Sequence, residues 1–488
     1  MLVLISGRVR REAGKAVGRR ETVMAMDDNI SNKRARNTLL ILATLLLAFN
    51  YVDRLVLALV LQDIKLDLHL SDTLLGFLSG IAFAVFYATM GVPIARLADR
   101  GDRVAIISIA AALWSVCVAL CGAATSFIQL FMIRIGVAVG EAGCIPPAQS
   151  LLSDFFPRSD RARAFAIYAL GGPLSVILGS FVAGWINEYY GWRATFVIVG
   201  CPGILLALLA WLLLNEPRSA ASTRATIRSL GPPDTTGGSE IATQSSDTAA
   251  KNTSFKDDVL SLAKNASFRH LLIAQTILYF FIYGIVIQWQ PSFFIRTYGF
   301  TTGELGTWQL LSWCVMGSIG VYGGGAIVHR FMARDEGRQL RLMGVSVSIY
   351  GLLNILVYLT PYRYVALGLT VLAAPFYNCI YGPVYALNQS VVPERMRATA
   401  VAIVLFFANL VGMGMGGLAT GMLSDALAHI YGADSLRYAL LIFSPGFLWC
   451  GIHLWLASRT VALDIARVNE QGRYDLNNRD AVQAPFHA

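Results

Sequence analysis

The chain has 488 residues, and its composition is too apolar for a water-soluble protein. Hydrophobic residues make up 56% of it, against roughly 45–50% in globular chains, and charged residues 14%, against about 25%. The net charge of +9 could suggest nucleic-acid binding, but on so apolar a chain a basic surplus is expected in cytoplasmic loops. The composition therefore predicts a polytopic membrane protein that binds no nucleic acid.

Several classes of enzyme and cofactor protein lack support in the sequence. All seven cysteines fall in apolar runs, which favours buried thiols over disulfides or a zinc site. The sequence has no Gly-x-x-x-x-Gly-Lys-Ser/Thr phosphate loop and no HExxH or CxxC motif. The basic N-terminal region has no apolar core long enough for a signal peptide. We therefore expect no enzyme activity, no metal and no cofactor.

A membrane-spanning helix needs about 20 mostly apolar residues, and we find twelve such runs. They predict spans at 39–61, 73–95, 105–126, 128–151, 164–186, 195–214, 270–290, 304–328, 341–359, 364–387, 398–423 and 437–457. A polar stretch lies between the sixth and seventh spans, and its last part, from Phe255 to Ala263, has apolar residues at helical spacing. The sequence therefore predicts an all-α membrane protein of two six-helix bundles.

This pattern divides the chain into five parts and gives it an orientation. They are a basic tail (1–37), a six-helix bundle (38–215), a linker with a short amphipathic helix (216–268), a second six-helix bundle (269–460) and a C-terminal tail (461–488). With both termini and the linker in the cytoplasm, 32 of the 39 Lys and Arg residues lie on that side and 5 on the other. We expect a multi-pass plasma-membrane protein (of the inner membrane if bacterial) with cytoplasmic termini.

The two bundles resemble each other in sequence. A shift of 236 residues aligns Pro157 with Pro393 and Arg161 with Arg397, together with several alanines that follow. Two homologous bundles around a site near the membrane midplane are typical of secondary transporters.

Charge at the membrane centre distinguishes the two bundles. Four ionisable residues lie deep in the first bundle, and the same shift aligns them with neutral residues: Asp53 with Trp289, Arg54 with Gln290, Arg134 with Thr370 and Glu141 with Tyr377. Each charge at a helix centre costs on the order of 2.5–3.5 kcal/mol, so these charges must pair or face water. They mark the predicted site.

Helical geometry predicts that the four charges form a cluster. Glu141 and Arg134 are seven residues apart, so they share a face of one helix about 10 Å apart along its axis. Asp53 falls at a depth between them. We predict that Asp53 and Glu141 bind protons, and that Arg134, supported by Arg54, binds an anion. A purely structural ion-pair network between the two helices is the alternative.

The second bundle offers neutral and aromatic groups at the same depth. Among them we select Trp289, Tyr377 and Asn378 as substrate-binding residues. Charges on one side and apolar groups on the other suggest a cavity for an amphipathic molecule. We interpret His270 and His453 as isolated histidines and do not expect either to relay protons.

Five motifs stand out between about residues 40 and 460: Asn50-Tyr-Val-Asp53-Arg54, Arg134 with Gly140-Glu141-Ala-Gly143, Ala95 to Arg103, Gly191-Trp-Arg193 and Trp289-Gln-Pro291. In these motifs the chain resembles the major facilitator superfamily and, within it, the spinster-type transporters, whose animal members move lysophospholipids or sphingosine phosphate. The resemblance implies alternating access and links the charges at Asp53 and Glu141 to proton coupling. It also implies that Asp99, Arg100 and Arg103 gate the cytoplasmic side, although Ala95, Asp102 and Val104 depart from the superfamily motif.

The sequence therefore predicts a proton-coupled transporter of an amphipathic, lipid-like anion, which is monomeric and embedded in the bilayer. The proton is its coupling ion. A proton-coupled symporter of small organic acid anions is the main alternative, because such symporters have a motif similar to Asn-Tyr-x-Asp-Arg. A membrane-embedded enzyme or receptor on the same fold is an alternative of another class.

Overall fold

The computed structural model describes residues 2–217, 255–333, 335–393 and 396–483, and all regular elements in these ranges are helices. The first half of the chain contains α1 (Leu2–Leu68), α2 (Asp72–Gly76), η1 (Phe77–Ile81), α3 (Ala82–Arg100), α4 (Arg103–Cys121), α5 (Phe127–Ala142), α6 (Ile145–Phe155), α7 (Arg158–Ala169), α8 (Gly171–Val176), η2 (Ile177–Val182) and α9 (Ala183–Leu213). The stretches η1 and η2 are short π-helical segments within longer helices.

The second half begins with α11 (Phe255–Lys264), at the place where the sequence predicts an amphipathic helix. Its other elements are α12 (Ala266–Tyr279), η3 (Phe280–Val286), α13 (Ile287–Tyr298), α14 (Thr302–Gln309), η4 (Leu310–Met316), α15 (Gly317–Phe331), α16 (Glu336–Leu359), α17 (Arg363–Asn378), α18 (Tyr381–Ser390), α19 (Arg397–Phe407), η6 (Ala408–Gly414), α20 (Met415–Tyr431), η7 (Gly432–Asp434), α21 (Ser435–Phe443) and α22 (Gly446–Gln483).

These helices account for all twelve predicted spans. Nine helical stretches of the described chain are long and apolar enough to cross a membrane. Two of the nine, Ser159–Leu213 and Thr399–Glu470, each contain two predicted spans. The predicted span 364–387 is divided between α17 and α18, so it does not appear as one long helix.

Local sequence signals set several helix ends. Ser126 and Asn265 cap α5 and α12, each by accepting a hydrogen bond from a backbone N–H three residues later. Inside α9, Gly191 has a φ of 77°, a conformation that favours glycine, and it separates the fifth predicted span from the sixth. α5 ends before Gly143, and Pro146 and Pro147 then open α6.

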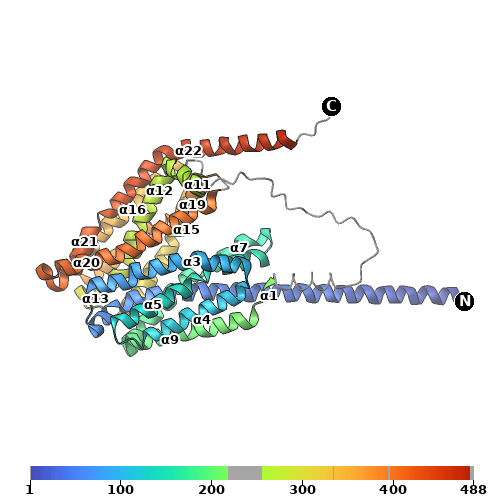
Figure 1. The fold of residues 1–488 in the computed structure, drawn as a ribbon, viewed down its shortest axis with the longest axis horizontal. Coiled ribbons are helices and arrows are strands. Elements are labelled where there is room, and N and C mark those ends of the chain that lie inside the picture. The colour runs from blue at the N-terminus through green and yellow to red at the C-terminus, as the bar shows by residue number, and fades with distance from the viewer. Residues whose placement is uncertain (1, 218–254, 334, 394–395, 484–488) are drawn as a thin grey trace.

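The two halves of the chain form two bundles that meet at one end of the molecule (Figure 1). The N-terminal part of α1 and the C-terminal part of α22 lie at the other end, to the right in that view. We call this end the terminal end, and the end that contains the turn from α1 to α2 the distal end.

Two carboxylates join the bundles at the distal end in a mirrored way. Asp425 on α20 accepts hydrogen bonds from the backbone N–H groups of Asp72 (3.0 Å) and Thr73 (2.7 Å) at the start of α2. Glu188 on α9 accepts one from Gly303 (3.1 Å) at the start of α14. A carboxylate at a helix N-terminus is stabilised by the helix dipole. Each bundle thus binds the N-terminus of the other bundle's second span.

An ion-pair network strengthens the same contact. The carboxylate of Asp72 accepts two hydrogen bonds from Arg296 (2.7 Å each), one from Lys65 (2.6 Å) and one from Ser424 (2.6 Å). Arg296 and Ser424 belong to the second bundle, whereas Asp72 and Lys65 belong to the first. The network therefore ties the distal ends of the bundles together.

Glycines let the helices approach closely at this contact. A Cβ atom at Gly76 on α2 would overlap the carbonyl oxygen of Gly417 on α20. One at Gly306 on α14 would likewise overlap the carbonyl oxygen of Ser180 on η2. The backbones pack against each other directly at these points, as small residues allow in membrane proteins.

Candidate functional site

The four charged residues of the predicted site form two ion pairs between α1 and α5. Arg54 on α1 contacts Glu141 on α5, with Nη2 2.6 Å from Oε2. Arg134 on α5 contacts Asp53 on α1, with Nη1 2.7 and 2.6 Å from the two carboxylate oxygens. Each helix supplies one acid and one base, so the charges compensate one another inside the bundle.

Glycines on α5 bring this helix close to its neighbour α4 at the depth of the ion pairs. A Cβ atom at Gly140 would overlap the backbone and side chain of Trp114, and one at Gly136 would overlap the sulfur of Cys117. Gly136 and Gly140 therefore serve the contact between α5 and α4. The ion pairs themselves make the contact between α5 and α1.

The two arginines differ in their access to solvent. The side chain of Arg134 is 2% exposed and that of Arg54 is 22% exposed, whereas both carboxylates are buried. Of the two side chains, Arg54 is therefore the more exposed. The sequence-based hypothesis gave the leading role in anion binding to Arg134, which is the more buried of the two.

Three aromatic rings surround the guanidinium of Arg54. Its Cζ atom lies 4.5 Å from the centre of the Phe83 ring, 5.0 Å from that of Tyr87 and 5.7 Å from that of Tyr51. Phe83 also lies 5.5 Å from Cζ of Arg134. Such contacts stabilise a cation without neutralising it, so Arg54 keeps its charge when its carboxylate partner changes. The sequence analysis did not select Phe83 and Tyr87, because both lie on α3 and nothing in their spacing relates them to α1.

One oxygen of the buried Glu141 carboxylate has no hydrogen-bond partner among the described residues. This atom is Oε1, and Oδ1 of the buried Asn50 is likewise unpartnered. The amide of Asn50 donates to the backbone oxygen of Glu141 (3.5 Å), so the Asn50 side chain contacts the backbone of α5 at Glu141. A buried acceptor without a donor costs free energy. The free oxygen of Glu141 is therefore a place where a proton could bind.

The three residues selected in the second bundle do not share one environment. Trp289 is fully buried, and its indole N–H donates to the backbone oxygen of Gly417 (3.0 Å), so it packs against α20. Tyr377 is buried between the rings of Trp313 and Tyr350, each 5.8 Å away between ring centres. The side-chain amide of Asn378 donates to a backbone oxygen of its own helix.

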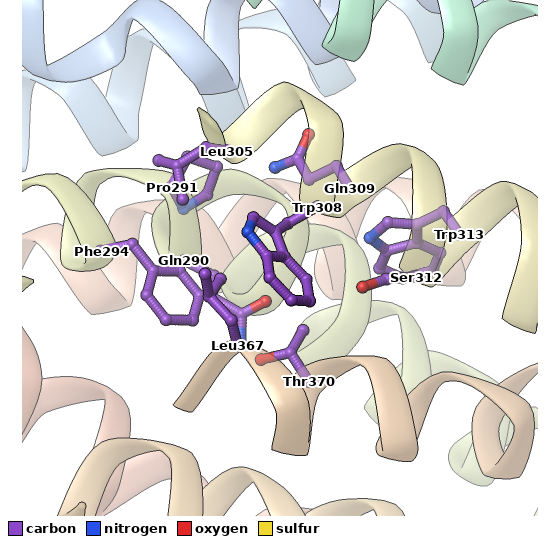
Figure 2. Close-up of a pocket in the computed structure, with 10 residues that line it drawn as sticks. All are labelled: Gln290, Pro291, Phe294, Leu305, Trp308, Gln309, Ser312, Trp313, Leu367 and Thr370. Atoms are coloured by element: carbon purple, nitrogen blue, oxygen red, sulfur yellow. The ribbon is translucent and has the colours of Figure 1, made fainter. Parts of the chain in front are cut away.

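A pocket lies in the second bundle between α13, α14, η4 and α17 (Figure 2). Its walls combine aromatic, aliphatic and neutral polar side chains: Gln290, Pro291, Phe294, Leu305, Trp308, Gln309, Ser312, Trp313, Leu367 and Thr370. Figure 2 shows the Trp308 ring pointing from α14 toward Gln290 and Thr370. None of the lining residues is charged. The sequence analysis did not identify this pocket, because its walls come from three separate spans.

The predicted gating residues lie near the terminal end. The side chain of Asp99 is outside the described part of the structure, and Arg100 is exposed. Arg103 is buried and binds Glu216, which follows α9, and Asp154 on α6 (2.6 Å). Arg103 thus ties the start of α4 to two other helix ends of the same bundle.

The interpretation of the two histidines as isolated residues is wrong. Nδ1 of His270 on α12 lies 3.0 Å from Nδ1 of His453 on α22, and the rings are 5.3 Å apart between their centres. Their separation of 183 residues gives no sequence signal for this contact. The described residues include no group of three or more His, Cys, Asp or Glu side chains that could hold a metal ion.

The chain belongs to the Major Facilitator Superfamily, whose family model matches residues 43–417. It is therefore a membrane transporter rather than an enzyme. Its fold is similar to that of a bacterial homologue of the human lysosomal transporter Spinster, solved in an inward-facing and unoccupied conformation. The two share 29% sequence identity with a TM-score of 0.72, over 88% of this chain and 98% of that one. The predicted fold class is confirmed.

Two further relatives show how wide the family is. The chain is 31% identical to an MFS-type efflux pump of Mycolicibacterium smegmatis over 418 residues, which cover 85% of this chain and 91% of the pump. It is 25% identical to mouse protein spinster homolog 3 over 463 residues, which cover 88% and 84% of the two chains. The predicted resemblance to spinster-type transporters is thereby confirmed.

Proposed function

We propose that this protein is a proton-coupled secondary transporter that moves an amphipathic anion by alternating access. The observation that carries the proposal is the Arg54–Glu141 pair, in which an arginine with a partly exposed side chain is held by a buried carboxylate with one free oxygen. Ionisable residues inside membrane spans are typical of a transport pathway.

The pair couples the proton to the anion through competition for Arg54. A proton on Glu141 removes the negative charge that holds the guanidinium, which frees Arg54 for an anionic headgroup. An anion on Arg54 in turn leaves Glu141 without its cation, and a buried carboxylate without a cation is costly. Proton binding and anion binding therefore favour each other, as linkage requires. Asp53 remains bound to the buried Arg134 and is the second proton site of the proposal.

The pocket of the second bundle supports an apolar part in the substrate. Trp308 and Trp313 offer large apolar surfaces, in a bundle that places no charged residue in the pocket. Gln290 and Thr370 in the same pocket could instead hydrogen-bond a small polar molecule, so transport of small organic acids is the second candidate. We assign Trp289, Tyr377 and Asn378 to the wall behind the substrate.

We assign the terminal end to the cytoplasm, because the basic tail and the basic loops lie there. The closed distal end then faces outward, as in an inward-facing transporter of the plasma membrane. In this proposal Asp99, Arg100 and Arg103 close the cytoplasmic side in the opposite state. The protein acts as a monomer, with residues 216–268 as a cytoplasmic linker.

The proposal is tested with purified protein in liposomes that carry a pH gradient. We expect Glu141→Gln and Asp53→Asn to fold but to lose gradient-driven uptake of a lysophospholipid, because each keeps the size of its side chain and loses the titratable group. Asp335→Asn is the control, since Asp335 is exposed on a helix cap at the surface. Unchanged gradient-driven uptake by the Glu141→Gln, Asp53→Asn double variant would refute the proton sites. Comparing lysophospholipids with short organic acids distinguishes the two substrate classes.

A further inference from the structure

A third carboxylate, Asp63, lies on α1 beyond the predicted end of the first span. It follows Asp53 by ten residues on a continuous helix, which places it about 15 Å closer to the distal end. Its side chain is partly buried, and Oδ2 accepts a hydrogen bond of 2.6 Å from the amide of Asn187 on α9. The same amide donates to the hydroxyl of Thr302 on α14 (3.1 Å). Asp63 is thus linked to the surface where the two bundles meet.

The basic groups near Asp63 all bind other carboxylates. Lys65 and Arg296 contact Asp72, and Arg193 contacts Asp67. The nearby acids are engaged too: Glu188 binds the N-terminus of α14, and Glu304 takes part in the capping box at Thr301. His69 is exposed at the end of α1. Among the described residues, Asp63 therefore has a neutral amide as its partner and no cation.

A carboxylate that is taken out of water without a cation costs free energy, whereas its protonated form costs much less. When the bundles separate at the distal end, water can reach Asp63 and its charge is solvated. When they close, the carboxylate is partly withdrawn from water beside Asn187. Closure of the distal end and protonation of Asp63 should therefore accompany each other.

We propose that Asp63 is a further proton-binding residue of the transporter, loaded from the distal side as that side closes. The proposal rests on proton coupling as the proposed function. Water at the distal side delivers the proton to the free carboxylate oxygen, and the Asn187 hydrogen bond to Oδ2 is kept. The carboxyl releases the proton to water when the distal end opens again.

The experiment uses an isosteric pair of variants on one helix. Asp63→Asn retains an oxygen that accepts from Asn187 but cannot carry a charge or titrate. Asp67→Asn is the matched control, because Asp67 lies one turn further along, is 45% exposed and is paired with Arg193. Asp63→Glu keeps a titratable group and serves as the conservative variant if Asp63→Asn folds poorly.

Two measurements are made on the full-length protein in liposomes or nanodiscs between pH 5.5 and 8. Hydrogen exchange of distal peptides of α1 and α14, corrected for the intrinsic rate, should show more protection at low pH in wild type, Asp67→Asn and Asp63→Glu. Asp63→Asn should be protected at every pH, and its uptake should depend much less on external pH. The inference would be overturned if, in Asp63→Asn, both the hydrogen exchange and the uptake depended on pH as strongly as they do in the wild-type protein.

The two proposals fail in different ways. If wild-type uptake does not respond to a pH gradient, proton coupling itself is wrong. If wild-type uptake responds and Glu141→Gln abolishes the response, while Asp63→Asn behaves as wild type, proton coupling stands and only the role of Asp63 is refuted.

Discussion

The two bundles share a pattern of six spans but differ in the side chains that they place at the middle of the membrane. In the first bundle, α1 and α5 exchange two reciprocal ion pairs, and three of the four charged side chains are almost wholly buried. In the second, the positions aligned by the 236-residue shift hold Trp289, Gln290, Thr370 and Tyr377, which pack or line a neutral pocket. Charged and neutral side chains at the aligned positions are therefore separated between the bundles.

This division has a physical reason. Charges inside a bilayer are tolerated only when each has a partner of opposite charge. Reciprocal pairing between two adjacent helices gives all four charges a partner. The second bundle has neutral residues at the aligned positions and needs no such pairing. Substitutions at aligned positions should thus have very different effects in the two bundles.

The largest expected effect is on stability, from Arg134→Ala. This change leaves Asp53 buried without a cation, and breaking a buried ion pair in this way costs about 3–5 kcal/mol. The aligned change in the second bundle, Thr370→Ala, removes a hydroxyl that bonds within its own helix and should cost about 1 kcal/mol or less. Thermal unfolding of both variants in detergent checks the prediction. Equal losses would show that the two bundles do not differ in this way.

The sequence predicts the cluster of four charges, because their depth in the spans and the cost of isolated charges leave little choice. It does not predict which acid meets which base, nor that Arg54 is the more exposed of the two arginines. These depend on the rotation of α1 and α5 about their axes and on the rings of Phe83 and Tyr87, which arrive from a different helix. Helical periodicity within one segment contains no such information.

The next effect concerns ligand binding by Arg54. Arg54→Lys keeps the charge but removes the planar guanidinium, so it should weaken binding of a lysophospholipid or carboxylate about tenfold. A neutral analogue with the same tail should bind Arg54→Lys as it binds wild type. Arg134→Lys, at the more buried cation, should change the affinities for both ligands by similar factors. Titration calorimetry with each ligand distinguishes these outcomes, and equal losses for both ligands in Arg54→Lys would exclude it as the headgroup site.

The sequence pattern does not predict contacts between segments that are far apart in the chain. The contact between His270 and His453 and the mirrored caps by Asp425 and Glu188 each join segments more than a hundred residues apart. The sequence analysis did not identify Asp63 as a site residue for a different reason. The apolar run ends at residue 61, whereas α1 continues to Leu68. Hydropathy measures where a chain is apolar, and helices extend past that point when caps and ion pairs support them.

A smaller effect is expected in the neutral bundle. Trp313→Ala opens the pocket of Figure 2 and removes apolar surface, so affinity for long-chain ligands should fall several-fold. Each methylene that loses its contact is worth about 0.8 kcal/mol at most, so the loss should grow with tail length. Trp449→Ala is the control, because Trp449 lies on α22 with 55% of its surface exposed. A loss that is independent of tail length would argue for a polar substrate.

The smallest effect is expected from shortening the segment that connects the bundles. Residues 225–244 lie outside the described part of the structure, and they are polar, rich in Gly, Ser and Thr, and lack an apolar face that could pack. Each bundle buries its own core, and the ion pairs and caps at the distal end already join the two. Deleting residues 225–244 should therefore leave thermal stability and uptake close to wild type. Glu216→Gln, just before this stretch, is the contrasting change, because Glu216 binds the buried Arg103 and its loss should destabilise the first bundle. A deletion as harmful as Glu216→Gln would show that the connecting segment itself holds the bundles together.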